Sequence, residues 1–185
     1  MTYYEVLLFV HLLGVATWFG TGFALLVLGS RFGRAGDNQG LQSLFGQAEW
    51  LATRVFIPVS LIVVVAGVLL VIEGPWAFDQ LWVLLGLAGF AATFLTGLLV
   101  IKPHSERIAA DLARDGMTPG SARAIGTMFA RQRIDYTVIA LVIADMVVKP
   151  TGDDVFTLLL MAAVLVVVVA LVLRSERSPA AEKTA

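Results

Sequence analysis

Five long apolar stretches, separated by short polar segments, constrain this chain more than any other feature of its sequence. The first, Tyr3 to Leu28, holds 26 residues with one acid at its rim and a single ionisable side chain, His11, well inside. An apolar helix of about 20 residues crosses a bilayer, so this stretch predicts a membrane helix. The N-terminal residues MTYYE lack the basic n-region of a secretory signal, so we expect this helix to remain in the mature protein.

The other four stretches predict four more spans: Val55–Ile72, Leu81–Ile101, Ile134–Val148 and Val155–Leu173. Of these, Ile134–Val148 has only 15 residues and contains Asp145, so a four-span bundle is the alternative. We predict an all-α, polytopic transmembrane helical bundle. Residues 1–173 form its single domain, and residues 174–185 form a short polar cytoplasmic tail.

Composition excludes several other classes of protein. Only 15% of the residues are charged, 58% are hydrophobic and the mean hydropathy is +0.87, so the chain lacks the polar surface of a water-soluble domain. A net charge of −1 provides no basic field for nucleic acid, and the expected partner is the lipid bilayer. The absence of cysteine excludes thiolate metal sites, iron–sulfur clusters and covalent c-type haem.

The distribution of lysine and arginine predicts the orientation. The segments before the second span, between the third and fourth spans, and after the fifth are rich in basic residues, whereas 73–79 has none and 149–154 has only Lys149. Basic loops face the cytoplasm, so five spans with the N-terminus outside and the C-terminus inside fit a multi-pass protein of the bacterial inner membrane. The aromatic residues agree, with Tyr3, Tyr4, Trp76 and Trp82 expected at the outer boundary and Trp50 and Tyr136 at the inner one.

Both basic loops contain helical patterns. Leu41, Leu44, Phe45, Ala48 and Leu51 recur at spacings of three and four, which predicts a short amphipathic helix that covers the bundle or binds a partner. In the second loop, Thr118 is a predicted N-cap and Pro119 the first helical residue. We expect one long helix to run from there through the fourth span.

Small residues form stripes on two of the predicted helices. They are Gly86, Gly89, Thr93, Thr96 and Gly97 on the third span, and Ala16, Gly20 and Ala24 on the first. Small side chains let helix backbones approach closely in lipid, so we predict that the first and third spans pack against each other. The same faces could instead pair two copies of the chain, which leaves a homo-oligomer open.

His11 is the candidate site residue, and two interpretations of it compete. A neutral imidazole can simply hydrogen-bond to a neighbouring helix. It can also be the axial ligand of haem or a metal. The only other histidine, His104, differs from it in depth by about 20 Å, so the two cannot share one metal within a subunit.

Four residues are predicted near the outer side together with His11: Glu5, Glu73, Asp145 and Met146. Asp145 could orient the histidine or relay a proton, or it could reach water or pair with Lys149. Arg54 and Asp135 are interpreted as charges at the membrane boundary without a mechanistic role.

The segment HLLGVATWFGTGF, from His11 to Phe23, resembles the first helix of a bacterial membrane superfamily. The superfamily includes the copper-resistance D proteins and the haem-containing protoporphyrinogen oxidase. Within it, the chain is most similar to the family called domain of unknown function 2269, which also resembles WVLLGLAGFAATFLTGLLVIKPH. The resemblance implies that His11 is a haem ligand. The lysine that the oxidase needs in its third helix is absent between Trp82 and Ile101, which argues against that reaction.

Three functions follow as hypotheses, and the sequence does not decide whether the chain is an enzyme. The first is a membrane protein that binds b-type haem through His11 and transfers electrons to a membrane redox partner. The second is a copper-handling protein or small-solute carrier in which His11, Met146 and Asp145 line a polar path. The third is a structural or assembly subunit without a cofactor.

Overall fold

In the computed structural model, residues 1–177 are described, apart from the side chains of residues 48, 49, 176 and 177. All regular structure in this part of the chain is helical, which confirms the all-α prediction. The elements are α1 (Tyr3–Ala35), α2 (Asn38–Gly46), α3 (Ala48–Leu51), the π-helical segment η1 (Ala52–Phe56), α4 (Ile57–Glu73), α5 (Leu81–Thr96), the π-helical segment η2 (Gly97–Ile101), α6 (Lys102–Asp115), α7 (Pro119–Val148) and α8 (Val155–Arg177). The predicted tail falls largely on residues 178–185, outside the described residues.

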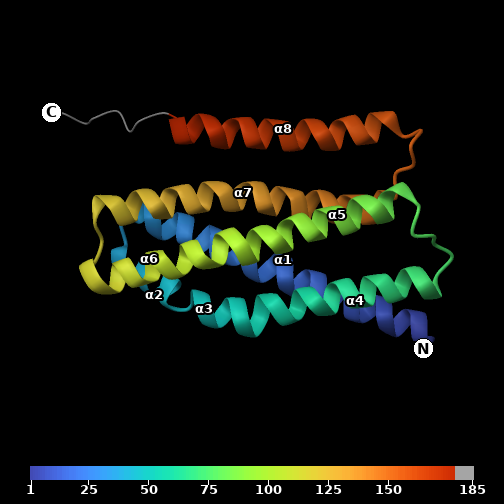
Figure 1. The fold of residues 1–185 in the computed structure, drawn as a ribbon, viewed down its shortest axis with the longest axis horizontal. Helices are drawn as coiled ribbons and strands as arrows, with labels where there is room; N and C mark the ends of the chain where they lie inside the picture. Colours follow the sequence, from blue (N-terminus) through green and yellow to red (C-terminus); the bar gives the residue numbers. More distant parts are fainter. Residues whose placement is uncertain (178–185) are drawn as a thin grey trace.

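The long helices lie roughly side by side (Figure 1). The N-terminus and the α4–α5 and α7–α8 connections gather at one end, here called the Trp76 end, and α2 and the α6–α7 turn gather at the other, the α2 end. Four helical stretches are long and apolar enough to cross a membrane: Tyr3–Ala35, Ala52–Glu73, Leu81–Asp115 and Val155–Ser175. The chain is thus an all-helical protein with four apolar membrane-spanning candidates.

Helix α7 is the fifth long helix of the bundle. It runs alongside the others, but four charged residues, Arg131, Arg133, Asp135 and Asp145, reduce the hydropathy of residues 131–148. It begins where the sequence predicted, because the Thr118 hydroxyl accepts a hydrogen bond from the Ser121 N–H at 3.1 Å, with Pro119 in the first turn. It ends at Lys149, which adopts the left-handed conformation with φ 52°.

The helix pairs differ from those predicted. The strongest packing joins α1 to α4 and α5 to α7, so the predicted pairing of the first and third spans is wrong. On the stripe with Gly20, a Cβ added at that glycine would meet no neighbour within 4 Å. The glycines in close contact on α1 are instead Gly14, which faces Val63 of α4, and Gly22 and Gly29, which face Tyr136 and Phe129 of α7. Gly22 and Gly29 are seven residues apart on α1, and the two aromatic residues are seven apart on α7, as expected for two antiparallel helices that pack at two successive points.

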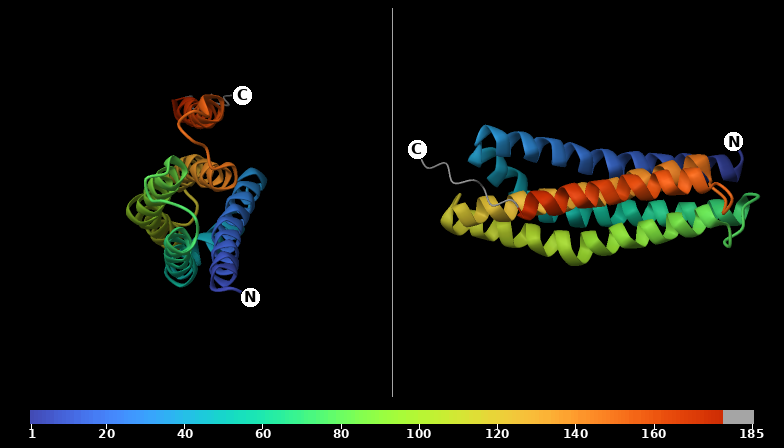
Figure 2. Two further views of the ribbon diagram at one scale, coloured as in Figure 1. Left: turned by 90° about the vertical axis from the view of Figure 1, so that its right-hand side faces the viewer. Right: turned by 90° about the horizontal axis from the view of Figure 1, so that it is seen from above.

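The α2 end is closed by a small core of its own. Its buried members are Leu41 and Phe45 of α2, Ile108 and Leu112 of α6, and Ile125, Met128 and Phe129 of α7. The amphipathic segment therefore covers the bundle, as one of the two sequence interpretations held. In contrast, α8 packs on α7 and stands apart from the other helices (Figure 2).

Two prolines explain the two π-helical segments. A proline within a helix has no N–H, and its ring clashes with the carbonyl four residues before it. Counting back four residues from Pro58 and Pro103 gives Arg54 and Leu99, the central residues of η1 and η2. The helix widens there, and the Ile57 and Lys102 N–H groups donate to the carbonyls five residues earlier. Two continuous helices, 48–73 and 81–115, thus carry the same irregularity near the α2 end.

Candidate functional site

The imidazole of His11 is held by the backbone of the neighbouring helix. Its Nδ1 lies 2.9 Å from the Val63 carbonyl oxygen on α4. A carbonyl only accepts hydrogen bonds, so Nδ1 carries the proton and Nε2 keeps a free lone pair. Gly67, one turn further along α4, makes room for the ring, because a Cβ there would lie 3.1 Å from His11 Cε1. The local sequence therefore fixes both the tautomer and the position of the ring.

His11 lines a cavity of about 260 Å³ toward the Trp76 end, here called the His11 cavity. The wall is mainly aliphatic and aromatic, with Trp18 from α1, Trp82 and Phe90 from α5 and Met146 from α7. Gly67 and Gly86 lie in the same wall. The imidazole nitrogen of His11, the thioether sulfur of Met146 and the hydroxyl of Tyr4 are thus the metal-ligating groups that this cavity presents.

A cation lies at one edge of the His11 cavity. The Lys149 Nζ lies 4.9 Å from the centre of the Trp76 ring and 5.5 Å from that of Trp82, and the two indoles meet edge to face at 5.2 Å. Cation–π contact of this kind holds a charge at an apolar boundary. The Trp82 Nε1–H donates to the Gln80 side-chain oxygen at 3.2 Å, which fixes the indole.

Asp145 does not behave as either sequence interpretation supposed. It is 1% exposed, and among the described residues no hydrogen bond reaches either carboxylate oxygen. It does not reach water or pair with the Lys149 ammonium. It also does not contribute to the wall of the His11 cavity, although its neighbour Met146 does. Its carboxylate lies instead against α5, with Oδ2 3.7 Å from where a Cβ of Gly86 would be.

The remaining predicted neighbours of His11 have ordinary positions. Glu5 forms a capping box at the start of α1, where its carboxylate accepts the Thr2 N–H at 2.8 Å. Glu73 is exposed at the end of α4. His104 lies in the first turn of α6 and lines a groove with Arg131, away from the His11 cavity. Among residues 1–177, no three His, Asp or Glu side chains are placed to share a metal ion.

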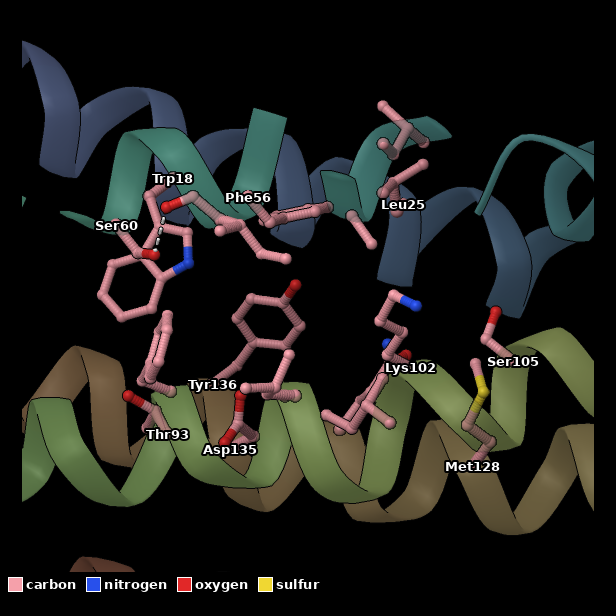
Figure 3. Close-up of a pocket in the computed structure, with 18 of the residues that line it drawn as sticks. Trp18, Leu25, Phe56, Ser60, Thr93, Lys102, Ser105, Met128, Asp135 and Tyr136 are labelled. Atoms are coloured by element: carbon pink, nitrogen blue, oxygen red, sulfur yellow. Dashed lines mark hydrogen bonds between the residues drawn. The ribbon is translucent and has the colours of Figure 1, made fainter. Parts of the chain in front are cut away.

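A second cavity, of about 170 Å³, lies toward the α2 end and is here called the Asp135 cavity. Figure 3 shows Asp135 and Tyr136 side by side on α7, facing Trp18, Phe56 and Ser60 across the cavity. The sequence interpretation placed Asp135 and Tyr136 at the membrane boundary. In the structure both are half-buried, and the Tyr136 ring points into the bundle toward Gly22.

The two π-helical segments form opposite walls of the Asp135 cavity. Ala52 and Phe56 contribute from η1, and Gly97, Leu98 and Ile101 contribute from η2. A π-turn is wider than an α-turn and redirects the side chains around it, which is why such turns recur at functional sites. The signal was present in the sequence as Pro58 and Pro103 inside two apolar spans.

Three residues belong to the walls of both cavities: Trp18 of α1, Thr93 of α5 and Ile139 of α7. The Trp18 indole packs on Phe90 with 5.8 Å between ring centres. Thr93 satisfies its hydroxyl within α5, by donating to the Gly89 and Phe90 carbonyls. These three side chains, here called the partition, are all that the two cavities share.

Comparison with family models gives one match, to the family described as "Predicted integral membrane protein (DUF2269)", over residues 5–150. The matched region contains both cavities and ends just before α8. Comparisons with curated proteins and with solved structures gave no match.

Proposed function

Since the chain belongs to the DUF2269 family of predicted integral membrane proteins, we propose that it binds b-type haem through His11 and serves in electron transfer or redox chemistry within the membrane. The observation that carries the proposal is the His11 hydrogen bond. A metal-ligating histidine typically donates its second ring N–H to a carbonyl or carboxylate, as Nδ1 does here to Val63. Nε2 is then the ligand that remains.

The wall of the His11 cavity has the chemistry that such a group requires, but its volume of about 260 Å³ is below the roughly 300 Å³ at which drug-sized pockets begin, so binding haem requires the helices around it to move apart. Its wall is apolar and aromatic, as a macrocycle requires, and Met146 offers a thioether from the helix opposite His11. Lys149 supplies a positive charge for the haem carboxylates. When bound, haem would supply a one-electron couple, and His11 would hold its iron in a cavity with few polar groups. The resemblance of the first helix to the copper-resistance D and haem oxidase superfamily supports the same proposal.

The topology that we propose has five spans, with the N-terminus outside the cytoplasm, in a bacterial inner membrane. It is supported by the basic residues, because Lys149 is the only lysine or arginine in the chain segments at the Trp76 end. All the others within residues 1–177 lie toward the α2 end. The chain has no cysteine, so single cysteines placed at the exposed positions Asp79 and Ala122 can be labelled in intact cells with a membrane-impermeant maleimide, and we expect labelling at 79 only. Labelling at position 122 and not at 79 would reverse the orientation.

The haem proposal is tested by the visible spectrum of the detergent-purified protein, expressed with haem supplied and recorded oxidised and dithionite-reduced. We expect a Soret band and a reduced α-band in the wild type and in His104→Ala, and neither band in His11→Ala. His104→Ala is the matched control because it removes the only other histidine. A colourless wild type, or bands that persist in His11→Ala, would contradict the proposal.

A second candidate function is copper handling or the carriage of a small solute. It is favoured by the presence of His11 and Met146 in one cavity wall, since imidazole and thioether together suit copper(I). Asp145 was part of this hypothesis but is absent from that wall. Copper(I) titration of the haem-free wild type beside Met146→Leu distinguishes this function, because haem binding through His11 alone does not require a thioether.

A further inference from the structure

The Asp135 cavity is walled by aromatic rings from several elements. Trp18 comes from α1, Phe56 from η1, Phe94 from α5, and Phe129 and Tyr136 from α7. Figure 3 shows Trp18, Phe56 and Tyr136 around the central space. Aromatic faces carry the negative side of a quadrupole, so a cavity enclosed by them favours a cation over an anion.

The same cavity contains a carboxylate without a protein partner. Within residues 1–177, the ion pairs and hydrogen bonds of the structure do not involve Asp135. The nearest basic member of the wall, Lys102, is paired with Glu106 of α6. Arg133 is exposed and lies outside this wall, whereas Arg131, also exposed, lines an adjoining groove together with Asp135 and His104. An ionised carboxylate in such surroundings is stabilised most by a positive charge that enters the cavity.

We propose that the Asp135 cavity is a binding site for a small organic cation of the ammonium class. The carboxylate would pair with the charge, and the rings of Trp18, Phe56 and Tyr136 would contact the carbon substituents. The Tyr136 hydroxyl and the Trp18 Nε1–H also have no hydrogen-bond partner among the described residues, so they are available to a hydroxyl on the ligand. The inference is independent of haem at His11.

The volume limits the size of the ligand. An apolar cavity of about 150 Å³ accommodates a molecule of the size of benzene. At about 170 Å³, the Asp135 cavity matches ligands of that size and is smaller than the roughly 300 Å³ at which drug-sized pockets begin. Choline and ethanolamine are within the limit. The two π-helical segments create this space, because regular turns at η1 and η2 would redirect the side chains that bound it.

The proposal is tested by equilibrium dialysis of labelled choline against the purified full-length protein in an uncharged detergent. The variants are Asp135→Asn, Phe56→Leu and the control Asp111→Asn, which changes an exposed acid on α6 that pairs with Arg114. We expect saturable binding by the wild type and Asp111→Asn. Affinity should fall at least tenfold in Asp135→Asn and about three- to tenfold in Phe56→Leu, because one loses the charge and the other one aromatic face.

An uncharged competitor separates charge recognition from simple filling of the cavity. 3,3-Dimethylbutan-1-ol has the shape of choline without its charge, and it should not displace choline. Displacement at similar concentrations, equal choline affinity in folded Asp135→Asn, or no binding of choline or ethanolamine by the wild type would each overturn the proposal. Added phosphatidylethanolamine identifies the source of the ammonium group. Displacement of choline points to a lipid headgroup, and no displacement points to a free cation.

Discussion

The two cavities of this bundle share three wall residues yet are formed in different ways. The His11 cavity lies between regular helices, and the absence of side chains at Gly67 and Gly86 leaves room in its wall for the side chains of His11 and Met146. The Asp135 cavity lies between two π-helical segments, where the backbone itself is displaced by Pro58 and Pro103. One presents uncharged nitrogen and sulfur ligands, and the other presents a carboxylate. Small residues and prolines thus produce two chemically distinct sites on one set of helices.

The two acids of α7 sharpen the contrast. Asp135 and Asp145 are ten residues apart on one helix, but only Asp135 faces a cavity. Asp145 is enclosed against α5 without a partner among the described residues. An acid in an apolar helix therefore indicates a binding site only if its carboxylate faces a cavity.

Truncating Trp18, one of the three residues of the partition, should cause the largest change in the free energy of unfolding. Trp18→Ala takes away the largest side chain that the two cavities share, and we expect it to lower the free energy of unfolding by about 3 kcal/mol. Denaturation in detergent micelles measures this, with Trp50→Ala as the control, since Trp50 is 57% exposed and should change stability little. A cost below about 1 kcal/mol would show that neighbouring side chains collapse into the space and keep the cavities separate.

The next largest change in stability should come from substituting Asp145, and here we expect a gain where Trp18→Ala gives a loss. Asp145→Leu replaces a fully buried carboxylate, without a partner among the described residues, by an apolar side chain of the same branched shape, so stability should rise by about 1–3 kcal/mol. The same denaturation assay measures it. Asp135→Leu should gain less, because its carboxylate faces a cavity. A loss of stability in Asp145→Leu would reveal that a proton or a bound group satisfies this acid in the membrane.

A smaller effect tests how α1 closes the Asp135 cavity. A Cβ on Gly22 would overlap the Tyr136 side chain, so Gly22→Ala should cost about 1–2 kcal/mol through overpacking. Gly20→Ala is the matched control on the same helix, where a Cβ meets nothing within 4 Å and alanine improves helix propensity. Equal stability of the two variants would contradict the packing of α1 on α7 described above.

The smallest expected effect is on stability at acid pH, and it comes from Asp154 in the segment between α7 and α8. The Thr151 N–H and hydroxyl donate to Asp154 Oδ2 at 2.7 and 2.8 Å, and these bonds hold the pKa of Asp154 below its ordinary value of 3.8. A lowered pKa means that this contribution to stability is present above pH 3.8 and is lost as the pH falls through the folded-state value. Asp154→Asn should therefore flatten the acid limb of the stability profile. An unchanged limb would show that Asp154 contributes nothing to it.

Much of the fold could be read from the sequence, because bilayer thickness and helix capping act locally. Four of the five apolar stretches fall on candidate membrane helices, and the Thr118 cap and the covering role of Leu41 and Phe45 were also predicted correctly. Helix partners were not, since the stripe with Gly20 looks as suitable for packing as Gly22, and only the position of Tyr136 on a distant helix distinguishes them.

The site was predicted in part. His11 stood out as the single histidine deep in a span, but its partner is a backbone carbonyl, which no side-chain pattern marks. Asp135 was interpreted only as a charge at the membrane boundary. The cavity beside it depends on Trp18 of α1 and Phe56 of η1, which lie far from it in the sequence, so no local pattern marked it as a wall residue.

The position of α8 has a consequence for how such chains diversify. It lies outside the region matched by the family model, packs on α7 and contributes to neither the His11 cavity nor the Asp135 cavity. Helix α7 ends at the Trp76 end, on the side of the bundle where α1 begins, and α8 runs back from there to the α2 end. Gain or loss of this one helix would therefore move the last helix end from one end of the bundle to the other, and both cavities would keep their walls.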